Sequence, residues 1–169
     1  MNSSTLKIRI YGDPCLRKKC APLKEVGPSE RMLIQSMIAT MHQAKGVGLA
    51  APQIGISQRF FVMDIGDGPM VIINPRITKR FGSGAFEEGC LSIPEVTIMV
   101  ERPQKVTIQY MDENNQMMRM TCDDLLARVI QHETDHLDGK LIVDYASEGE
   151  KEKFKEQLEA LKSGQKGQG

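Results

Sequence analysis

Two of the three histidines in this sequence lie four residues apart, in the stretch QHETDHLDG at 131–139. Residues i and i+4 share one face of an α-helix, so His132 and His136 can hold one metal ion between them. Glu133 lies about 100° round the helix from His132, which places it beside a water on that metal and not among the ligands. This is the position of a general base. The alternative is a polar helix end, where the helix dipole favours His136.

A catalytic metal needs a third protein ligand and an open coordination position. The stretch EEGCLSIP at 87–94 offers Cys90, which follows a glycine and precedes a short apolar strand ending at Pro94. A thiolate there could turn toward the histidine helix. The alternative is that Cys90 is a small buried hydrophobic residue in a β-segment. The remaining cysteines are expected to be reduced, partly buried thiols: Cys15, Cys20 and Cys122.

A third unusual stretch is GVGLAAPQIG at 46–55. Its glycines and alanines remove side-chain bulk where a ligand or another backbone segment approaches, and Gln53 adds one amide to an otherwise apolar loop. The stretch lacks the context of a Rossmann or P-loop fingerprint. The alternative is a tight loop that packs against a sheet.

Three amphipathic segments are predicted to be helices that position these residues. The first runs from Ser29, a candidate N-cap, to about Lys45, with Gly46 as its stop. Its expected core face consists of Met32, Leu33, Met37, Ile38 and Met41. The second is LLARVIQHETDHLD at 125–138, with Thr121 or Asp123 as N-cap and Gly139 at its end. The third runs from about Ser147 to Lys162 and places Phe154, Leu158 and Leu161 on one stripe.

Residues 58–121 change to short runs that are typical of β-strands. These runs are RFFVMDI at 59–65, MVIINP at 70–75, VTIMV at 96–100 and KVTIQYMD at 105–112. Turns are predicted at Gly66 to Pro69 and at Asp112 to Asn115. The predicted fold is therefore α+β, with mostly antiparallel sheets around a central helix that carries HExxH, an N-terminal helix and a C-terminal helix.

Size and charge limit the classes of function. A chain of 169 residues is long enough for one sizeable core, so we predict a single domain at 1–162 and a disordered tail at 163–169. Lys plus Arg equals Asp plus Glu at 22 each, which leaves no net charge to attract nucleic acid. We find no signal-like, presequence-like or membrane-spanning segment, and we expect a soluble, cytoplasmic protein.

Taken together, the three stretches resemble the motifs of the peptide deformylase family. They read GVGLAAPQ at 46–53, EGCLS at 88–92 and QHETDHLDG at 131–139, and YGDPCLR near the N-terminus resembles the family's opening. The resemblance covers residues 6 to 145; the last helix is shared with only part of the family. It implies a hydrolase that removes the formyl group from the N-terminal formylmethionine of newly made peptides and releases formate.

The resemblance also implies roles for individual residues. The family's metal is typically Fe²⁺, which nickel, cobalt or zinc can replace, and its ligands correspond to Cys90, His132 and His136. Glu133 corresponds to the acid/base, while Gln53 and the backbone NH of Leu91 correspond to the groups that polarise the formyl oxygen. Substrate contacts are expected from Gly46, Val47 and Gly48. Nascent formylmethionyl peptides near the ribosome are the implied partners, and a bacterial source and a monomer are expected.

General chemistry supports these roles. A metal-bound water becomes a hydroxide near neutral pH and attacks the formyl carbon, while Glu133 takes the proton and passes it to the leaving amine. Leu125 and Val129 precede His132 on the same helix face, so we hypothesise that they line a pocket for the methionine side chain. Ordinary core packing is the alternative for both.

Three further readings stay open. Arg102 is hypothesised to pair with Glu87 or Glu88 and hold the cysteine loop, although a solvated surface arginine is equally compatible with the sequence. The chain could instead be an HExxH metallopeptidase, but no histidine follows His136 as a third ligand. A non-catalytic, ribosome-associated module is the other alternative. It would not need to keep Glu133 or Gln53, which hold no metal.

Overall fold

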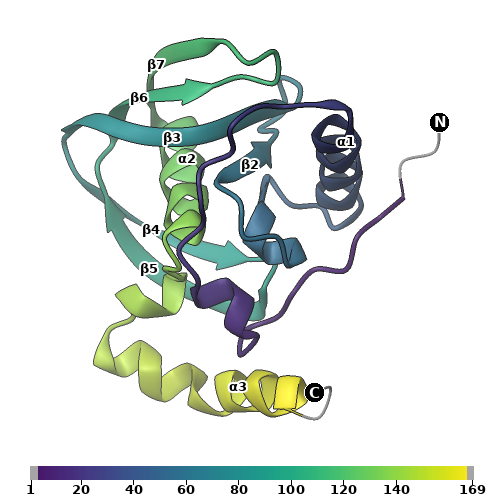
Figure 1. Ribbon diagram of the computed structural model, residues 1–169. Coiled ribbons are helices and arrows are strands. Elements are labelled where there is room, and N and C mark those ends of the chain that lie inside the picture. Colours follow the sequence, from purple (N-terminus) through teal and green to yellow (C-terminus); the bar gives the residue numbers. More distant parts are fainter. Residues whose placement is uncertain (1–3, 167–169) are drawn as a thin grey trace.

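The structure is a computed structural model, and it describes residues 4–166. Within them the chain forms a five-stranded and a two-stranded antiparallel sheet with three α-helices (Figure 1). The larger sheet has the order β1-β2-β3-β6-β7, with bounds Gly48–Ala50, Phe60–Met63, Met70–Phe81, Lys105–Met111 and Met117–Asp123. The smaller sheet pairs β4 (Gly84–Cys90) with β5 (Ile93–Arg102). The predicted mixed α+β class with antiparallel sheets is confirmed.

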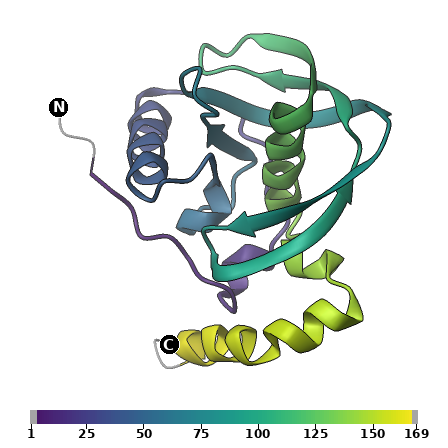
Figure 2. The ribbon, with the colours of Figure 1, turned by 180° about the vertical axis from the view of Figure 1, so that it is seen from behind.

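The helices are α1 (Pro28–Gln43), α2 (Asp124–Leu137) and α3 (Glu148–Lys166). In Figure 1, α2 runs down from the five-stranded sheet toward the β4–β5 hairpin, which Figure 2 shows from behind. One face of α2 packs on the larger sheet through Ala127, Val129 and Ile130, which share a core cluster with Phe61 and Ile108. None of the helices in the described part of the chain is both long and apolar enough to span a membrane.

The start and end of α1 differ from the prediction. Ser29 is not the cap; the helix begins at Pro28, and the Glu30 carboxylate accepts a hydrogen bond of 2.9 Å from the Gly27 backbone N–H. The helix ends at Gln43, and the left-handed residue after it is Lys45, with a φ of 58°, not the predicted Gly46. Met32 does not belong to the core face, because its side chain is 68% exposed. The buried face consists of Ile34, Met37, Thr40 and Met41.

Three strands were not predicted: β1, β4 and β7. β1 lies inside the expected Gly/Ala loop, β4 reads GAFEEGC, and β7 is a largely exposed edge strand. β1 and β4 show neither the alternation nor the apolar run that marks a strand in sequence. β7 does alternate from Met118 to Asp123, but this run was not among the predicted strands. The expected short apolar strand ending at Pro94 is also wrong, since β5 begins at Ile93 and continues through the exposed Pro94 to Arg102. The predicted turns at 66–69 and 112–115 do separate β2 from β3 and β6 from β7.

The bounds of α2 and α3 were predicted closely, with two corrections. Asp123 occupies the N-cap position of α2, but its side chain makes no capping hydrogen bond. After α2, Gly139 has a φ of +74°, and a Cβ there would lie 2.5 Å from the Arg17 carbonyl oxygen. Only glycine fits this contact. The second correction is that α3 continues to Lys166, through part of the expected tail, because an established helix extends at little cost. Residues 167–169 of that predicted tail lie outside the described residues.

Candidate metal centre

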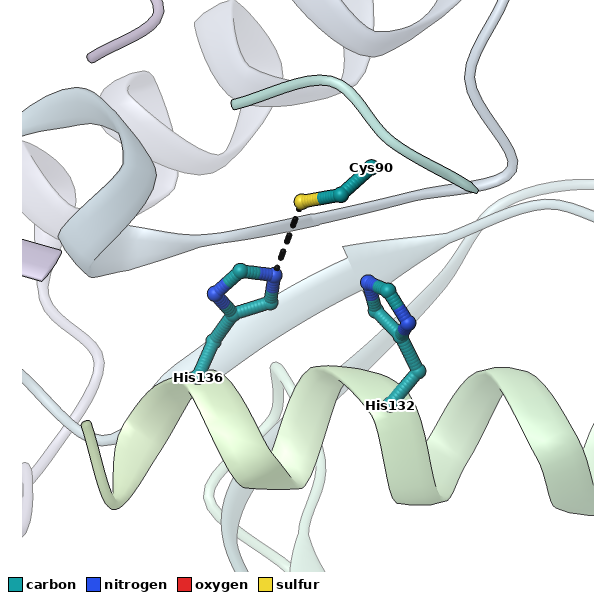
Figure 3. Close-up of side chains that lie close together, drawn as sticks. All are labelled: Cys90, His132 and His136. Carbon is teal, nitrogen blue, oxygen red and sulfur yellow. Dashed lines mark hydrogen bonds between the residues drawn. The ribbon is translucent and has the colours of Figure 1, made fainter. Parts of the chain in front are cut away.

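Three side chains from two distant parts of the chain converge on one point (Figure 3). Cys90 stands at the end of β4, and His132 and His136 lie one turn apart on α2. One ligand atom from each lies within 4.8 Å of the other two. The Cys90 Sγ atom is 3.3 Å from His136 Nε2. The i, i+4 spacing accounts for the two imidazoles, and the fold brings the thiol to them.

The local structure of β4 turns Cys90 toward α2. The pairing of β4 with β5 is irregular between Glu88 and Cys90, and the chain then reverses within Leu91 and Ser92 before β5 begins. Such an irregularity bends the strand and redirects a side chain. From the other side, Gln53 Nε2 donates to the Cys90 Sγ at 3.6 Å. The thiol is therefore held at the junction of the Gln53 loop, β4 and α2.

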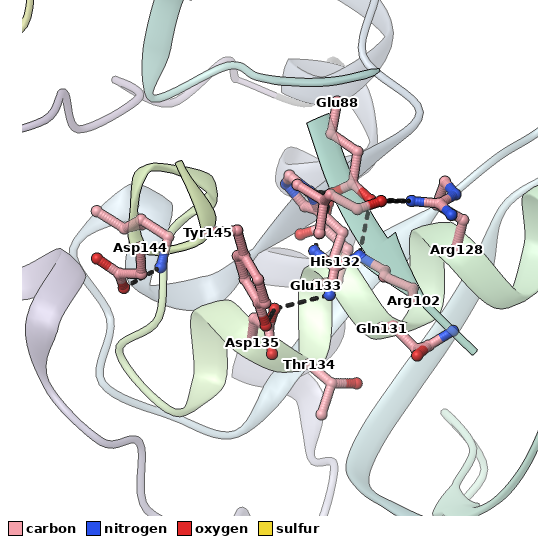
Figure 4. Close-up of polar contacts among 12 residues, drawn as sticks. Glu88, Arg102, Arg128, Gln131, His132, Glu133, Thr134, Asp135, Asp144 and Tyr145 are labelled. Carbon is pink, nitrogen blue, oxygen red and sulfur yellow. Dashed lines mark hydrogen bonds and ion pairs between the residues drawn. The ribbon is translucent and has the colours of Figure 1, made fainter. Parts of the chain in front are cut away.

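His132 is oriented by a buried carboxylate. Its Nδ1 atom lies 2.9 Å from Glu88 Oε1, which leaves Nε2 directed to the cluster (Figures 3 and 4). The Arg102 guanidinium binds both Glu88 oxygens, at 2.7 and 2.8 Å. Burial alone would raise the pKa of Glu88, but the hydrogen bonds from Arg102 and His132 outweigh it and lower this pKa to about 2. Glu88 is thus an anion that fixes one histidine ring.

Two further residues complete this ionic network. Arg128 donates to Glu88 Oε2 at 2.6 Å and to the backbone oxygens of Val100 and Gly84, at 3.1 and 2.8 Å. Asp135 accepts from Arg102 at 2.8 Å and from the Tyr145 hydroxyl at 2.7 Å. The network therefore ties α2 to both strands of the small sheet (Figure 4).

Glu133 is buried beside the cluster. Its Oε1 atom lies 4.0 Å from His132 Nε2, and its Oε2 atom has no hydrogen-bond partner among the described residues. Burial raises the pKa of Glu133 to about 7. Gly48 is the residue that makes room for it, since a Cβ at that position would collide with the Glu133 carboxylate. The unpartnered oxygen is therefore available to a water or substrate atom at the cluster.

Gln53 lies opposite, in the short 3-10 helix Ala51–Ile54 after β1. Its Oε1 accepts from the Ala50 backbone N–H at 2.9 Å, and its Nε2 also donates to Ser92 Oγ at 3.1 Å. The side chain is 1% exposed, so these contacts hold the amide in one orientation. Its nitrogen faces the thiol.

A cavity of about 410 Å³ opens onto this arrangement. It is lined by Cys90, His132, Glu133 and Gln53, by residues 45–48, by residues 87–91 and by Leu125, Arg128 and Val129. The wall formed by Leu125 and Val129 is apolar, while the opposite edge is glycine-rich. The space is large enough for a side chain and a few backbone atoms of a ligand.

The chain is similar to proteins of a known family. The family model described as polypeptide deformylase matches residues 5–152. A peptide deformylase of Chlorobaculum parvum is 46% identical over 166 residues, covering 94% of this chain and 89% of the relative. The chain belongs to the peptide deformylase family.

Solved structures of peptide deformylases agree with this assignment. The one from Legionella pneumophila has a TM-score of 0.89 and 41% identity, and covers 96% of this chain and 98% of its own. The one from Thermotoga maritima has a TM-score of 0.83 and 44% identity, with coverages of 85% and 98%. Peptide deformylases remove the formyl group from peptide N-termini, and this chain is a hydrolase of that family.

All the residues that the sequence singled out as site residues lie together in this deformylase fold. The cavity is lined by Gly46, Val47, Gly48, Gln53, Cys90, Leu91, Leu125, Val129, His132 and Glu133, and His136 contacts the Cys90 thiol. Leu125 is 53% exposed, which does not fit the core-packing alternative, whereas Val129 is 5% exposed and serves both the core and the cavity. Arg102 pairs with Glu88 and not with Glu87, and it is 4% exposed, so the surface-arginine alternative is wrong.

Sequence reasoning missed four residues around the site: Ser92, Arg128, Asp135 and Tyr145. Two of them carried a usable signal. Arg128 lies four residues before His132 and Asp135 three residues after it, so both face the same side of α2 as that histidine. Ser92 belongs to EGCLS but nothing in the sequence connects it to Gln53. Tyr145 lies in a short 3-10 helix after α2, and its contact with Asp135 depends on that turn.

The cluster fits a divalent metal. One thiol and two imidazoles converge, and one imidazole is backed by a carboxylate. A buried carboxylate oxygen beside them has no hydrogen-bond partner within residues 4–166. A histidine ligand commonly donates its other ring N–H to such a carboxylate. Sulfur and nitrogen donors suit Fe²⁺, Zn²⁺, Ni²⁺ and Co²⁺.

Proposed function

We propose that this protein is a metal-dependent peptide deformylase that acts on the N-terminal formylmethionine of newly synthesised peptides and releases formate. The observation that carries the proposal is the convergence of Cys90, His132 and His136 at a cavity whose wall also holds the buried Glu133. The HExxH helix α2 would be the central element of this arrangement. Three protein ligands leave room for a water or substrate, as catalytic sites of this type require.

Cys90, His132 and His136 would hold the metal, with Fe²⁺ as the ion in the cell and Zn²⁺, Ni²⁺ or Co²⁺ as replacements in purified protein. When bound, the metal would supply a hydroxide nucleophile near neutral pH. Glu88 keeps the His132 ring in the orientation needed for binding, and the two arginines keep Glu88 charged.

Glu133 would accept the proton of the attacking water and deliver it to the nitrogen of the leaving amine. An amine leaves far more readily once its nitrogen is protonated. The geometry supports this role because Glu133 Oε2 is buried at the cluster and has no competing partner among the described residues. Gly48 keeps the space above the carboxylate free of a side chain.

Negative charge develops on the formyl oxygen during the attack, and fixed donors would stabilise it. Gln53 Nε2 and the backbone N–H of Leu91 are the proposed donors. Gln53 is preorganised by Ala50 and Ser92, so little reorientation is needed at the moment of reaction. A donor of this kind is typically worth roughly 2.7–4 kcal/mol in the transition state.

The cavity can accommodate a methionine side chain next to the formyl group. Leu125 and Val129 give one apolar wall, and an unbranched thioether adapts well to such a surface. Gly46 to Gly48 lie along the glycine-rich edge, where a substrate backbone can approach. A Val129→Asp variant should lose turnover of formylmethionyl peptides; unchanged turnover would reject Val129 as part of the pocket.

The proposed substrate also indicates where in the cell the protein would act. Formylated nascent chains emerge from ribosomes, so we propose that it acts in the cytoplasm of a bacterium, near the ribosome, as a monomer and without direct nucleic-acid binding. The equal numbers of basic and acidic residues support the last point. Gel filtration of the metal-loaded protein tests the oligomeric state. Binding to labelled RNA at low salt tests whether the protein contacts nucleic acid directly.

The deciding experiment measures formate release from formyl-Met-Ala-Ser by protein purified anaerobically with Fe²⁺. The control is Glu133→Ala, with metal content measured for both proteins. Formate release by the wild type and its loss in a variant that still holds metal is the expected result. A fully metallated wild type that releases no formate would overturn the proposal, and casein cleavage would then test the metallopeptidase alternative.

A further inference from the structure

The chain before α1 makes two passes along the molecule (Figure 1). Residues 4–13 lead to the short 3-10 helix Pro14–Arg17, and residues 18–27 return to α1. We call residues 9–15 the N-terminal strap. The strap lies against both loops that bring neutral groups to the site: the Gln53 loop and the Leu91–Ser92 turn.

Two backbone hydrogen bonds join the strap to these loops. The Arg9 N–H donates to the Gln53 carbonyl at 2.6 Å, and the Tyr11 N–H donates to the Ser92 carbonyl at 2.8 Å. In extended backbone, residues two apart point their N–H groups to the same side. A single stretch of three residues therefore spans two loops that are 39 positions apart in sequence.

A third contact extends the clamp along the Gln53 loop. The Cys15 thiol donates to the Pro52 carbonyl at 3.3 Å. Cys15 is itself held in place, because its backbone N–H donates to Asp13 Oδ1 at 3.0 Å. Two successive carbonyls of the Gln53 loop, those of Pro52 and Gln53, thus accept hydrogen bonds from the strap.

The two residues whose carbonyls bind the strap, Gln53 and Ser92, also meet through their side chains. Gln53 and Ser92 are 1% and 0% exposed, and the Gln53 Nε2 atom donates to Ser92 Oγ at 3.1 Å. Buried backbone carbonyls need partners, and for these two residues the strap provides them. The strap thus binds the backbone of both residues whose side chains meet in the Gln53–Ser92 hydrogen bond.

We propose that the N-terminal strap is a positioning element of the active site, and that it acts by setting the spacing between the Gln53 loop and the Leu91–Ser92 turn. The proposal rests on the proposed function, since it concerns the donors assigned to the formyl oxygen. No residue of the strap lines the cavity, and among the described residues none of them hydrogen-bonds to Cys90, His132 or His136. The strap reaches the cavity lining through the backbone carbonyl of Gln53. A small displacement of a donor costs catalysis more than binding.

Proline substitution separates the backbone donor from the side chain. Arg9→Pro removes the N–H that binds Gln53, whereas Arg9→Ala removes only a side chain that is 45% exposed. Ile10→Pro is the matched control, because the Ile10 N–H has no hydrogen bond to any residue that the structure describes. With formyl-Met-Ala-Ser, Arg9→Pro should lower kcat by about 10- to 100-fold with little change in KM. Arg9→Ala and Ile10→Pro should stay close to wild type.

A second background tests whether the loss passes through Gln53. In Gln53→Ala, which has no amide left to position, adding Arg9→Pro should cost little further activity, as expected for coupled residues. The visible absorption spectrum of the Co²⁺-loaded Arg9→Pro protein should match that of the wild type, because the Cys90 thiolate is not displaced. A merely structural role would lower kcat equally in both backgrounds.

Three outcomes would overturn the inference: wild-type kcat in Arg9→Pro, an equal loss in the two backgrounds, or an altered cobalt spectrum. If Arg9→Pro does not fold, as judged by its thermal melt, Cys15→Ala and Cys15→Ser replace it. Loss of kcat in Cys15→Ala with recovery in Cys15→Ser, which keeps a donor, supports the strap, and equal kcat rejects it. An inactive, fully metallated wild type would instead reject the proposed function itself.

Discussion

The two sides of the site are built from different interactions. On the side of β4, β5 and Arg128, the contacts are between buried charged groups. The Glu88 carboxylate forms hydrogen bonds with Arg102, Arg128 and His132. On the side of the Gln53 loop, the contacts are neutral amides, hydroxyls and backbone groups. Charged contacts orient His132, a proposed metal ligand, and neutral contacts orient Gln53, a proposed donor to the substrate.

This difference has an energetic consequence. A buried ion pair is costly to break on one side, because the remaining charge is stranded away from water. A neutral hydrogen bond at the edge of a cavity costs less, since water can take the place of the lost partner. We therefore expect damage to the charged side to appear first in stability and metal affinity. Damage to the neutral side should appear in kcat.

The largest effect is expected from Glu88→Ala. It leaves Arg102, which is 4% exposed, without its bidentate partner and removes the acceptor for His132. We expect a loss of about 3–5 kcal/mol in the free energy of unfolding, measured by urea denaturation. Metal affinity, measured by competition with a chelator, should fall roughly 10- to 100-fold. Wild-type stability and affinity would contradict the role of the buried carboxylate.

A smaller effect is expected from Arg128→Met. Methionine retains the aliphatic bulk beside the cavity but removes the hydrogen bonds to Glu88, Gly84 and Val100. The free energy of unfolding should fall by about 1.5–3 kcal/mol, the range for hydrogen bonds to charged groups. Because Arg102 still binds Glu88, metal content should remain at the wild-type level. Loss of metal would mean that one arginine cannot hold Glu88 alone.

Gln53→Ala reverses this pattern and sharpens the comparison. The cavity admits water to the vacated position, so we expect a stability loss of only about 1 kcal/mol. The fall in kcat for formyl-Met-Ala-Ser should be about 10²- to 10³-fold, as for loss of one oxyanion donor. Thermal melts and steady-state kinetics on the same metal-loaded sample separate the two quantities. A large stability loss with unchanged kcat would assign Gln53 a structural role only.

The smallest effect is expected at Arg17–Asp144, an ion pair outside the site with side chains 43% and 34% exposed. Burial alone would raise the pKa of Asp144, but the hydrogen bond from Arg17 lowers it below its usual value. The contribution of this pair is therefore present above the unfolded pKa of Asp and is lost as pH falls through the lower, folded pKa. Solvent screening keeps it at or below about 1 kcal/mol. Asp144→Asn should flatten the unfolding free energy between about pH 5 and pH 2 slightly, relative to wild type.

The sequence predicted elements well where one local period dominated. α2 and α3 start within one or two residues of the prediction, and the mixed antiparallel class follows from helices at both ends and strands between them. Prediction failed for β1 and β4, whose glycines and charges show no strand period, and for β7, whose short alternation from Met118 to Asp123 was overlooked. These strands form because a neighbouring strand offers hydrogen bonds, which is a property of the assembled sheet.

By itself, the sequence determined the pair of imidazoles, because helix geometry converts the spacing of His132 and His136 into a shared face. It also determined the family, through three motifs and their order. Only the tertiary structure decided which carboxylate holds His132, how Cys90 reaches the histidines, and that Arg9 and Tyr11 clamp the Gln53 and Ser92 carbonyls. Those contacts join residues dozens of positions apart. Their geometry depends on how β4, α2 and the N-terminal strap pack together, which no local pattern encodes.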